Sequence, residues 1–293
     1  MGVVIDLHTH TTASDGSDSP KALVESAVAA GVTVLGLTDH DTTAGWAAAR
    51  DAVAGLSVPF TLITGTEFSC VHDGADGRPI SLHLLGYLFD PEHESLRLER
   101  ARLRTSRIGR GKAIVDNLVA AGHPVAWTRV AEIADGGSVG RPHIGQALVE
   151  AGVVGSVNEA FAELLSDSSP YYVHKQDMAV MDAISLIRAA GGVSVIAHPW
   201  ARRRGRILSE QDLAQLVEAG LGGFEVDHVD HTAPDRRRLR ELAAELGVVV
   251  TGSSDYHGDR KDVRLGAEQT DPAVLEHIVA ISHGAEPIRS SAR

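Results

Sequence analysis

Histidine and acidic residues in this chain occur in close pairs that suit metal binding. His8 and His10 are separated by one residue, and so are Asp255 and His257. On a β-strand alternate side chains point to the same face, so each pair offers two donor groups to one object. Imidazole nitrogen and carboxylate oxygen are ligands for Mn, Fe or Zn ions. The spacing therefore predicts a metal centre built where the first and last strands of a closed sheet meet.

Short apolar runs must position these residues, because most of the runs end at a histidine or an acid. Helix-like segments lie between several of the runs; Ser19 and Pro20, for example, suit the start of a helix that stops at Gly31. Alternating strands and helices favour parallel βαβ units in a barrel with polar residues at the strands' C-terminal ends. We expect an α/β barrel of seven strands, which are VVIDLH, VLGLTDH, FTLITGTE, HLLGYLF, VSVIAH, GGFEVDH and VVVTGSSDYH.

The polar residues at the ends of these runs form one candidate metal centre. They include six imidazoles and three carboxylates and no thiol, a donor set that suits Mn, Fe or Zn better than a structural zinc cage. The candidates are His8, His10, Asp15, His40, Glu67, His83, His198, Asp255 and His257.

The middle of the chain does not show the alternation of strands and helices. Between residues 91 and 176 the segments have helical patterns, including the basic run RLERARLRTSRIGRGK at 97–112. Because structureless connections longer than about 12 to 15 residues are uncommon, we interpret this region as a second unit over the barrel mouth. The predicted domains are a metal-binding barrel of residues 1–90 and 177–293, and a helical insertion subdomain of residues 91–176 that binds substrate.

Composition narrows the function classes. The formal net charge of −12 argues against a general polyanion binder, which needs a strongly basic face. Cys70 is the single cysteine of the 293 residues, which excludes an internal disulfide and favours a reducing cytoplasm. No run approaches the roughly 20 apolar residues of a membrane helix, and the first residues lack the pattern of a signal peptide. We expect a cytoplasmic protein with no membrane association.

The motifs along the chain resemble those of one family. DLHTHTTASDGS, GLTDHDT, GTEFS, HLLGY, AHP and SSDYHG are similar, in the same order, to the motifs of the PHP superfamily, named for polymerase and histidinol phosphatase. SDG, the central helices, GRPHI and PYYVHK resemble the TrpH-like branch, whose members are phosphoesterases acting on nucleoside 3′,5′-bisphosphates and, in some cases, on short RNA 5′ ends. The resemblance implies a distorted (β/α)7 barrel of the PHP type, with the helical insertion over its C-terminal face.

The resemblance also implies a trinuclear metal site with Glu67 shared by two ions. Mn²⁺ is favoured, with Fe²⁺ or Zn²⁺ as alternatives, and Glu67, His198 and Asp255 lie at the reacting phosphate. The implied sites are His8, His10, Glu67 and Asp255; Glu67, His83 and His198; and Asp15, His40 and His257.

This donor set has a chemical consequence of its own. Three divalent ions bring +6 and their three carboxylates −3, which leaves about +3 in the pocket of an acidic protein. Such a pocket attracts a phosphate dianion. Metal coordination lowers the pKa of a bridging water, so hydroxide is available near neutral pH for in-line attack on phosphorus.

Candidate substrate-binding residues lie mainly in the insertion. Arg141 and His143 in GRPHI and Lys175 in YYVHK suit a second phosphate, and His228 resembles a motif residue at the barrel edge. Asp227 stands where the family has tyrosine, which puts base or ribose contacts at that edge in doubt. The run RRRGR at 202–206 could also reach phosphate, although most of its arginines are expected to be solvated.

The leading hypothesis is a metal-dependent phosphatase that removes the 3′-phosphate of a nucleoside 3′,5′-bisphosphate. Its partner is then a small nucleotide, and no stable protein partner is expected. A 5′-to-3′ exoribonuclease on short oligonucleotides is the alternative, with the basic 97–112 segment holding the strand and short single-stranded RNA or DNA as the partner. Histidinol-phosphate phosphatase is a further alternative, although that branch typically has a histidine near the position of Asp15. A metal-stabilised binding module is disfavoured because structural metal sites fill their coordination with protein ligands.

Overall fold

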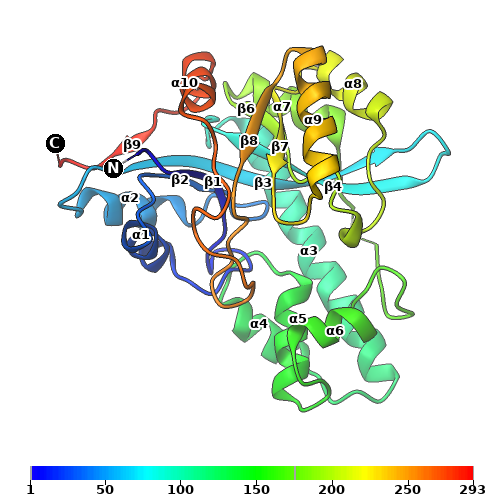
Figure 1. Ribbon diagram of the computed structural model, residues 1–293. Coiled ribbons are helices and arrows are strands. Elements are labelled where there is room, and N and C mark those ends of the chain that lie inside the picture. Colours follow the sequence, from blue (N-terminus) through cyan, green and yellow to red (C-terminus); the bar gives the residue numbers. More distant parts are fainter. Residues whose placement is uncertain (1, 175, 293) are drawn as a thin grey trace.

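A nine-stranded sheet forms the centre of the computed structural model, which describes residues 2–174 and 176–292 (Figure 1). The sheet curls into a nearly closed barrel, because His10 N donates to Tyr256 O at 2.9 Å and Thr270 N donates to Ile5 O at 3.0 Å. Seven strands follow one another around it: β1 (Ile5–Thr9), β2 (Val34–Leu37), β3 (Thr61–Asp73), β4 (Pro79–Tyr87), β6 (Val193–Ile196), β7 (Gly223–Asp227) and β8 (Val249–Gly252). Two short strands, β5 (Met178–Ala179) and β9 (Ile288–Arg289), pair with β3.

These seven strands coincide with the seven apolar runs of the sequence, so that prediction is confirmed. The expectation of an all-parallel barrel is wrong at one strand, because β4 runs antiparallel to both β3 and β6. No helix separates β3 from β4; a tight turn joins them, in which Gly77 has φ +71° and Gly74 N donates to Arg78 O at 3.1 Å. A hairpin can only reverse direction, and this reversal distorts the barrel.

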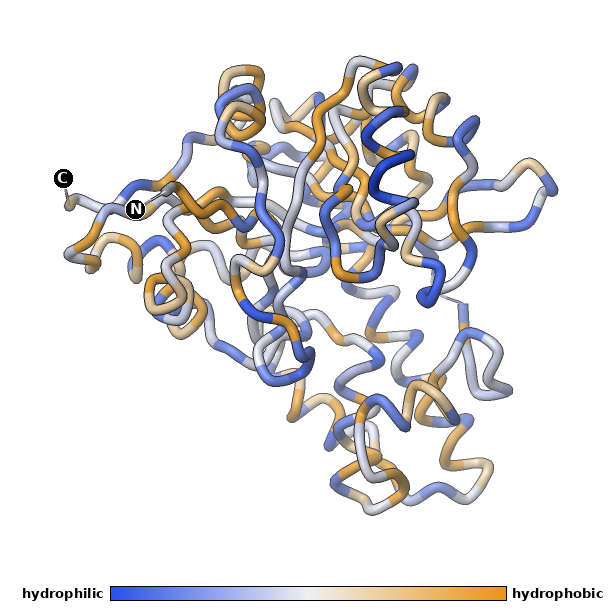
Figure 2. Tube along the Cα trace, in the orientation of Figure 1, coloured by the Kyte–Doolittle hydropathy of each residue, from blue (hydrophilic) through white to orange (hydrophobic). Residues whose placement is uncertain are grey.

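Helices cover the outside of the barrel and begin where the sequence places caps. Ser19 Oγ accepts a hydrogen bond from Ala22 N at 3.2 Å, and Gly31 follows the helix with φ +81°. Apolar stretches run along the strands, whereas α9 shows mostly hydrophilic residues (Figure 2). The covering helices are α1 (Pro20–Ala29), α2 (Trp46–Ala54), α7 (Val180–Ala189), α8 (Glu210–Glu218), α9 (Ala233–Leu246) and α10 (Pro272–Ile281).

Four further helices form a separate layer below the barrel in Figure 1: α3 (Glu94–Ala120), α4 (Trp127–Ala134), α5 (Arg141–Glu150) and α6 (Val157–Glu163). The long helix α3 connects two apolar cores. Leu96 and Leu103 pack in the barrel core, whereas Ile114 and Leu118 pack among the other insertion helices. The domain boundaries at residues 91 and 176 stay a prediction. Within the described ranges, no helix has the length and hydrophobicity needed to span a membrane.

Candidate metal centre

The C-terminal end of β1 carries two histidines into the barrel interior. His8 and His10 are fully buried and their Nε2 atoms lie 3.0 Å apart, so the predicted common orientation is confirmed. His8 Nδ1 lies 2.9 Å from Glu225 Oε1. We assign the proton to Nδ1 on the basis of this contact, which leaves the lone pair of Nε2 facing the centre.

Glu67 lies at the middle of the cluster and is 1% exposed. Five imidazoles surround its two carboxylate oxygens. Oε1 lies 2.8 Å from His83 Nδ1 and 3.1 Å from His198 Nε2, and Oε2 lies 3.1 Å from His10 Nε2, 3.2 Å from His8 Nε2 and 3.2 Å from His40 Nδ1.

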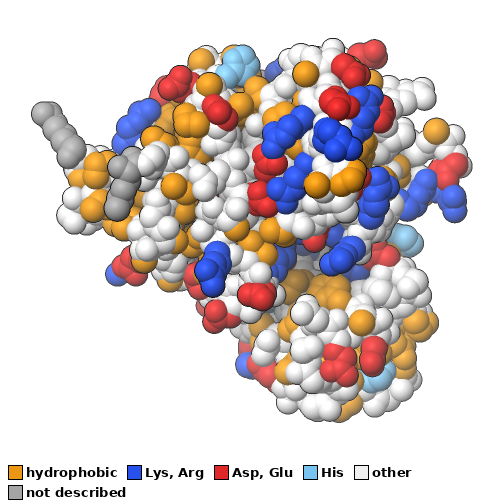
Figure 3. Space-filling view, in the orientation of Figure 1, with side chains coloured by type: hydrophobic (Ala, Val, Ile, Leu, Met, Phe, Trp, Pro, Cys, Tyr) orange, Lys and Arg blue, Asp and Glu red, His pale blue; other side chains and the backbone are white. Residues whose placement is uncertain are grey.

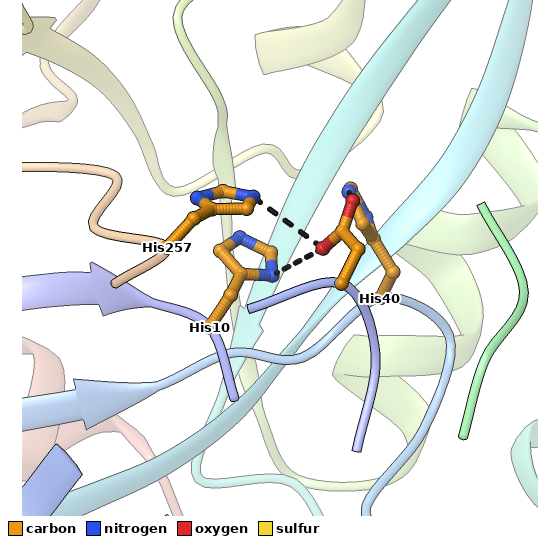
Figure 4. Close-up of side chains that lie close together, drawn as sticks. His10, His40 and His257 are labelled. Atoms are coloured by element: carbon orange, nitrogen blue, oxygen red, sulfur yellow. Dashed lines mark ion pairs between the residues drawn. The ribbon is translucent and has the colours of Figure 1, made fainter. Parts of the chain in front are cut away.

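A second carboxylate, Asp15, faces three histidines on the other side of His10. Figure 4 shows His10, His40 and His257 converging on one point. Asp15 Oδ1 lies 3.4 Å from His257 Nε2 and 3.6 Å from His10 Nδ1, and Oδ2 lies 3.7 Å from His40 Nε2. The loop that carries Asp15 packs tightly, because a Cβ at Gly16 would lie 2.5 Å from His10 O. This close approach explains the glycine of the SDG motif.

The third carboxylate, Asp255, has one oxygen toward the histidines and one toward cations. Oδ1 lies 3.5 Å from both His8 Nε2 and His10 Nε2. Oδ2 accepts hydrogen bonds from Arg204 Nη2 at 2.7 Å and from Lys261 Nζ at 2.6 Å. The inner oxygen is therefore placed among the candidate ligands, whereas the outer oxygen is already neutralised.

Two of the candidate residues have backbone conformations that side chains other than glycine rarely adopt. His198 has φ +30° and Asp255 has φ +55°. Such conformations cost about 1–3 kcal/mol each and cluster at functional sites. His198 is held in place by a hydrogen bond from its backbone N to Glu225 Oε2 at 2.8 Å. The fold thus tolerates local strain to aim these two side chains at the centre.

Burial and mutual charge set the protonation of the cluster. Burial raises the pKa of Glu67, but His83, His40 and His8 outweigh it and hold that pKa well below its usual range. Burial and Arg204 lower the pKa of His198 to about 3, and burial and Lys261 lower the pKa of His257 to about 4. Ionised carboxylates and neutral imidazoles are the forms that bind metal ions.

His8 is an exception to this pattern. Burial lowers its pKa, but Glu67, Glu225 and Asp255 outweigh burial and raise the pKa well above its usual value. Three carboxylates around one imidazole favour a positive charge at this point, which either a proton or a metal ion can supply.

Nitrogen and oxygen atoms in the cluster fit divalent metal ions. His40 Nδ1 is buried and, although Glu67 Oε2 lies 3.2 Å away, it forms no hydrogen bond of good geometry with any described residue, as expected for an atom that coordinates an ion. Three groups have ligand atoms within 4.8 Å of one another: His10, Asp15, His40 and His257; His8, His10 and Asp255; and His40, Glu67 and His83. The first group contains the predicted third site, and the other two overlap the predicted first and second sites. The ligand roles and the number of ions stay predictions.

Sequence analysis did not single out some residues that contact the candidate ligands. Glu225 is fully buried and contacts His8, Ser253 and the backbone of His198, although the sequence shows it only as one acid in the run GGFEVDH. Arg204 contacts Asp255 and lies in the run RRRGR, which the sequence marks only as a whole as able to reach phosphate, whereas Lys261 had no signal beyond its positive charge.

The predicted substrate-binding residues lie in different parts of the structure. His228 is fully buried, with Nε2 3.3 Å from Asp255 Oδ2, so it lies beside the metal cluster. His143 is 1% exposed and its Nδ1 accepts a hydrogen bond from Gly140 N at 2.9 Å at the start of α5. Burial lowers the pKa of His143 to about 4, so this imidazole is neutral at pH 7. Lys175 lies outside the described residues.

Arg141 belongs to a small group of aromatic and cationic side chains. It pairs with Asp167, its Nη1 donates to Leu165 O at 2.8 Å, and its guanidinium carbon lies 5.4 Å from the centre of the Tyr172 ring. Arg110 on α3 lies 5.4 Å from the same ring. Arg110 Nε and Nη2 are buried without hydrogen-bond partners. Figure 3 shows a hollow between the barrel and the insertion helices with basic side chains along its rim.

Comparisons with known proteins place this geometry in a family. The sequence profile of the PHP domain matches residues 6–131. The 5′-3′ exoribonuclease Rnm of Salmonella typhimurium is 32% identical over 276 residues, which are 94% of this chain and 92% of that protein. The chain belongs to the PHP family.

Two further relatives support the same assignment. A 3′,5′-nucleoside bisphosphate phosphatase of Chromobacterium violaceum is 32% identical over 254 residues, which are 86% of this chain and 87% of that protein. The crystal structure of a metal-dependent phosphoesterase from Bifidobacterium adolescentis superposes with a TM-score of 0.91 at 34% identity, covering 97% of this chain and 98% of that one. The PHP protein described here is accordingly a metal-dependent phosphoesterase with a distorted PHP barrel.

Proposed function

We propose that this PHP protein removes the 3′-phosphate from a nucleoside 3′,5′-bisphosphate and releases the 5′-monophosphate. The similarity to the Chromobacterium violaceum phosphatase supports this choice of substrate. One structural observation carries the proposal: Arg110 and Arg141 lie against the same Tyr172 ring, and the buried Nε and Nη2 of Arg110 have no hydrogen-bond partner among the residues that the structure describes. A second phosphate, held but not hydrolysed, would supply the missing acceptors.

The proposed metal ligands divide among three ions, with Mn²⁺ favoured and Fe²⁺ or Zn²⁺ as alternatives. Glu67 would bridge two of them, because its two oxygens face imidazoles on both sides. When bound, the ions would supply a hydroxide nucleophile at neutral pH and neutralise the phosphoryl oxygens. The assigned sets are His8, His10, Glu67 and Asp255; Glu67, His83 and His198; and Asp15, His40 and His257.

The second-phosphate residues adjoin this centre. The helix that begins with Arg141 and contains His143 starts beside Asp15, because a Cβ at Gly140 would lie 3.6 Å from Asp15 Oδ2. Neutral His143 accepts a hydrogen bond at Nδ1, so its remaining proton is on Nε2, where it can donate to a phosphate oxygen. Arg141 and Arg110 supply the positive charge. The insertion, residues 91–176, thus acts as the substrate-binding subdomain in this proposal.

Burial makes Arg110 well suited to an anion. Burial and the nearby Arg141 lower the pKa of Arg110 to about 10, yet the side chain is still charged at pH 7. Arg110 forms no hydrogen bond or ion pair within residues 2–174 and 176–292, and the charge of Asp177 offsets the effect of burial on its pKa only in part. Buried charges are normally paired, and a ligand phosphate is the pairing partner that the proposal provides.

Exoribonuclease activity on short oligonucleotides is the second candidate, and one observation favours it. A cavity of about 540 Å³ lies next to Arg110, and Arg102, Ser106 and His174 also line it. This cavity has room for nucleotides beyond the first, and the Rnm exoribonuclease is similar to this chain along most of its length. Both candidate substrates are small nucleotides or short RNA, which would place the enzyme in the cytoplasm.

Steady-state kinetics distinguishes the candidates. We expect Mn²⁺-loaded protein to show a kcat/KM for adenosine 3′,5′-bisphosphate at least 10-fold above those for a 5′-phosphorylated oligoribonucleotide, histidinol phosphate and p-nitrophenyl phosphate. A higher kcat/KM for the oligoribonucleotide would replace the phosphatase proposal with the exoribonuclease.

A further inference from the structure

Arg204 lies at the rim of the metal centre and contacts residues of three segments. Nε donates to Asp230 Oδ2 at 2.7 Å, and Nη2 donates to Asp255 Oδ2 at 2.7 Å. Nη1 lies 3.1 Å from His198 Nε2. The Arg204 side chain is 34% exposed, whereas that of Asp255 is 2% exposed. The guanidinium group is therefore positioned between the buried candidate ligands and the solvent.

Ion pairs on both sides hold the loop that carries Arg204. Arg202 pairs with Asp235 at 2.9 Å, and Arg206 pairs with Asp76 of the β3–β4 turn at 2.8 Å. These contacts keep the arginine between them at the rim. Arg203, next to Arg204, forms no hydrogen bond or ion pair with any residue that the structure describes, and it offers a matched control.

Lys261 joins Arg204 at the same carboxylate oxygen. Its Nζ donates to Asp255 Oδ2 at 2.6 Å, and its side chain is 32% exposed. An ammonium group has three donor hydrogens, and this contact uses one of them. Arg204 and Lys261 thus lie side by side at the rim of the metal centre, and both have N–H groups that remain free to donate hydrogen bonds.

The two carboxylate oxygens of Asp255 face different groups, which allows these cations and a metal ion to be present together. Oδ1 faces His8 and His10, so an ion held there would leave Oδ2 with Arg204 and Lys261. Coordination through His198 Nε2 would occupy the lone pair that faces Arg204 Nη1. A half-buried donor without an acceptor is unfavourable, and a phosphoryl oxygen would satisfy it.

We propose that Arg204 and Lys261 bind the phosphoryl group that is hydrolysed, as a second set of contacts opposite the metal ligands. Arg204 would contribute a planar fork of donors and Lys261 a point charge. The phosphate monoester dianion is the class of ligand that they recognise. This inference rests on the phosphoesterase chemistry of the proposed function, and it holds whichever ester is cleaved.

Calorimetric titration of the Mn²⁺-loaded full chain with inorganic phosphate tests the inference. Arg204→Ala should weaken phosphate binding by roughly 10- to 150-fold, the range for losing a charge-assisted contact, and Lys261→Ala should weaken it in the same direction. Arg203→Ala should stay within about twofold of the unmodified protein, because Arg203 has no hydrogen bond or ion pair with a described residue. Arg204→Lys keeps the positive charge but lacks the guanidinium fork, so its affinity for phosphate should lie between those of Arg204→Ala and the unmodified protein. This variant also tests the inference if Arg204→Ala fails to fold.

Titration of the metal-free variants with Mn²⁺ supplies the second readout. Arg204→Ala should bind Mn²⁺ as tightly as the unmodified protein or more tightly, because a competing cation is gone. Unchanged phosphate binding in both variants overturns the inference, and so does loss of Mn²⁺ binding in Arg204→Ala, which would mean that Arg204 holds the ligands. Failure of the unmodified protein to hydrolyse any phosphoester would refute the proposed function separately.

Discussion

Replacing Arg110 by alanine should lower activity on a bisphosphate and at the same time stabilise the free protein. Arg110 carries its charge in a half-buried position, and its Nε and Nη2 have no hydrogen-bond partner in the described part of the chain. Its nearest cation, Arg141, adds repulsion, and burial together with Arg141 lowers the pKa of Arg110 to about 10. These features oppose folding and favour an anionic ligand.

The size of the stability change follows from the pKa. A base whose pKa is lower in the folded state than in the unfolded state destabilises the fold wherever it is charged, which at pH 7 is the full effect. A fall of the Arg110 pKa from 12.5 to about 10 corresponds to an upper limit of about 3–4 kcal/mol in the free energy of unfolding. Partial exposure and the lost stacking on Tyr172 reduce the expected gain to about 1–2 kcal/mol, or a few degrees in Tm.

The size of the activity change follows from the contacts to phosphate. Losing a charge-assisted hydrogen bond costs about 1.5–3 kcal/mol, which is roughly 10- to 150-fold in kcat/KM. The assay compares adenosine 3′,5′-bisphosphate with p-nitrophenyl phosphate, which has no second phosphate and should be hydrolysed at a nearly unchanged rate. Thermal unfolding of the metal-free protein gives the stability.

Lys112 provides the control for this experiment. It is an exposed cation on the same helix, and it has no hydrogen bond or ion pair with the described residues. Lys112→Ala should alter neither kcat/KM nor Tm appreciably. An Arg110→Ala protein that loses both substrates equally, or that unfolds several degrees lower, would refute the reasoning, because Arg110 would then support the fold.

Three further predictions concern the metals and Arg141. Protein purified with Mn²⁺ supplied should carry more than two equivalents by elemental analysis, and chelation should abolish hydrolysis; full activity with one ion would contradict the trinuclear assignment. Asp15→Ala should reduce occupancy of one site and leave the pair bridged by Glu67 largely filled, whereas Glu67→Ala should empty two sites; equal metal loss would show that the partition is wrong. Arg141→Ala should lower kcat/KM for the bisphosphate by roughly 10- to 150-fold and barely change p-nitrophenyl phosphate hydrolysis; equal losses would assign Arg141 to the reacting phosphate or the fold.

Local patterns in the sequence were enough to predict the strands and their polar ends. The seven apolar runs correspond to seven strands, and the alternation at His8 and His10 brings both rings to one side. These features depend on side-chain period and on capping residues such as Ser19, which act over a few residues. The direction of β4 was missed because β3 and β4 are joined by a five-residue turn at 74–78, whereas a parallel βαβ unit would need a helical crossover between them.

The sequence could not show which of several similar residues lies at the site, because that depends on tertiary contacts. In RRRGR only Arg204 reaches the metal centre, while Arg202 and Arg206 pair with Asp235 and Asp76. Seven cations occupy 97–112, and composition does not distinguish buried Arg107, which pairs with Asp41, from Arg110. The sequence groups His143 with Arg141 as a phosphate ligand, and that role stays a prediction; it could not show that burial makes this imidazole neutral or that its Nδ1 accepts a hydrogen bond from Gly140 N.

Identification of the product of adenosine 3′,5′-bisphosphate tests the central claim most directly. Mn²⁺-loaded protein should convert it to adenosine 5′-monophosphate and one equivalent of inorganic phosphate, as separated by ion-exchange chromatography. Formation of adenosine 3′-monophosphate, or no release of phosphate under conditions where an oligoribonucleotide is degraded, would contradict the account.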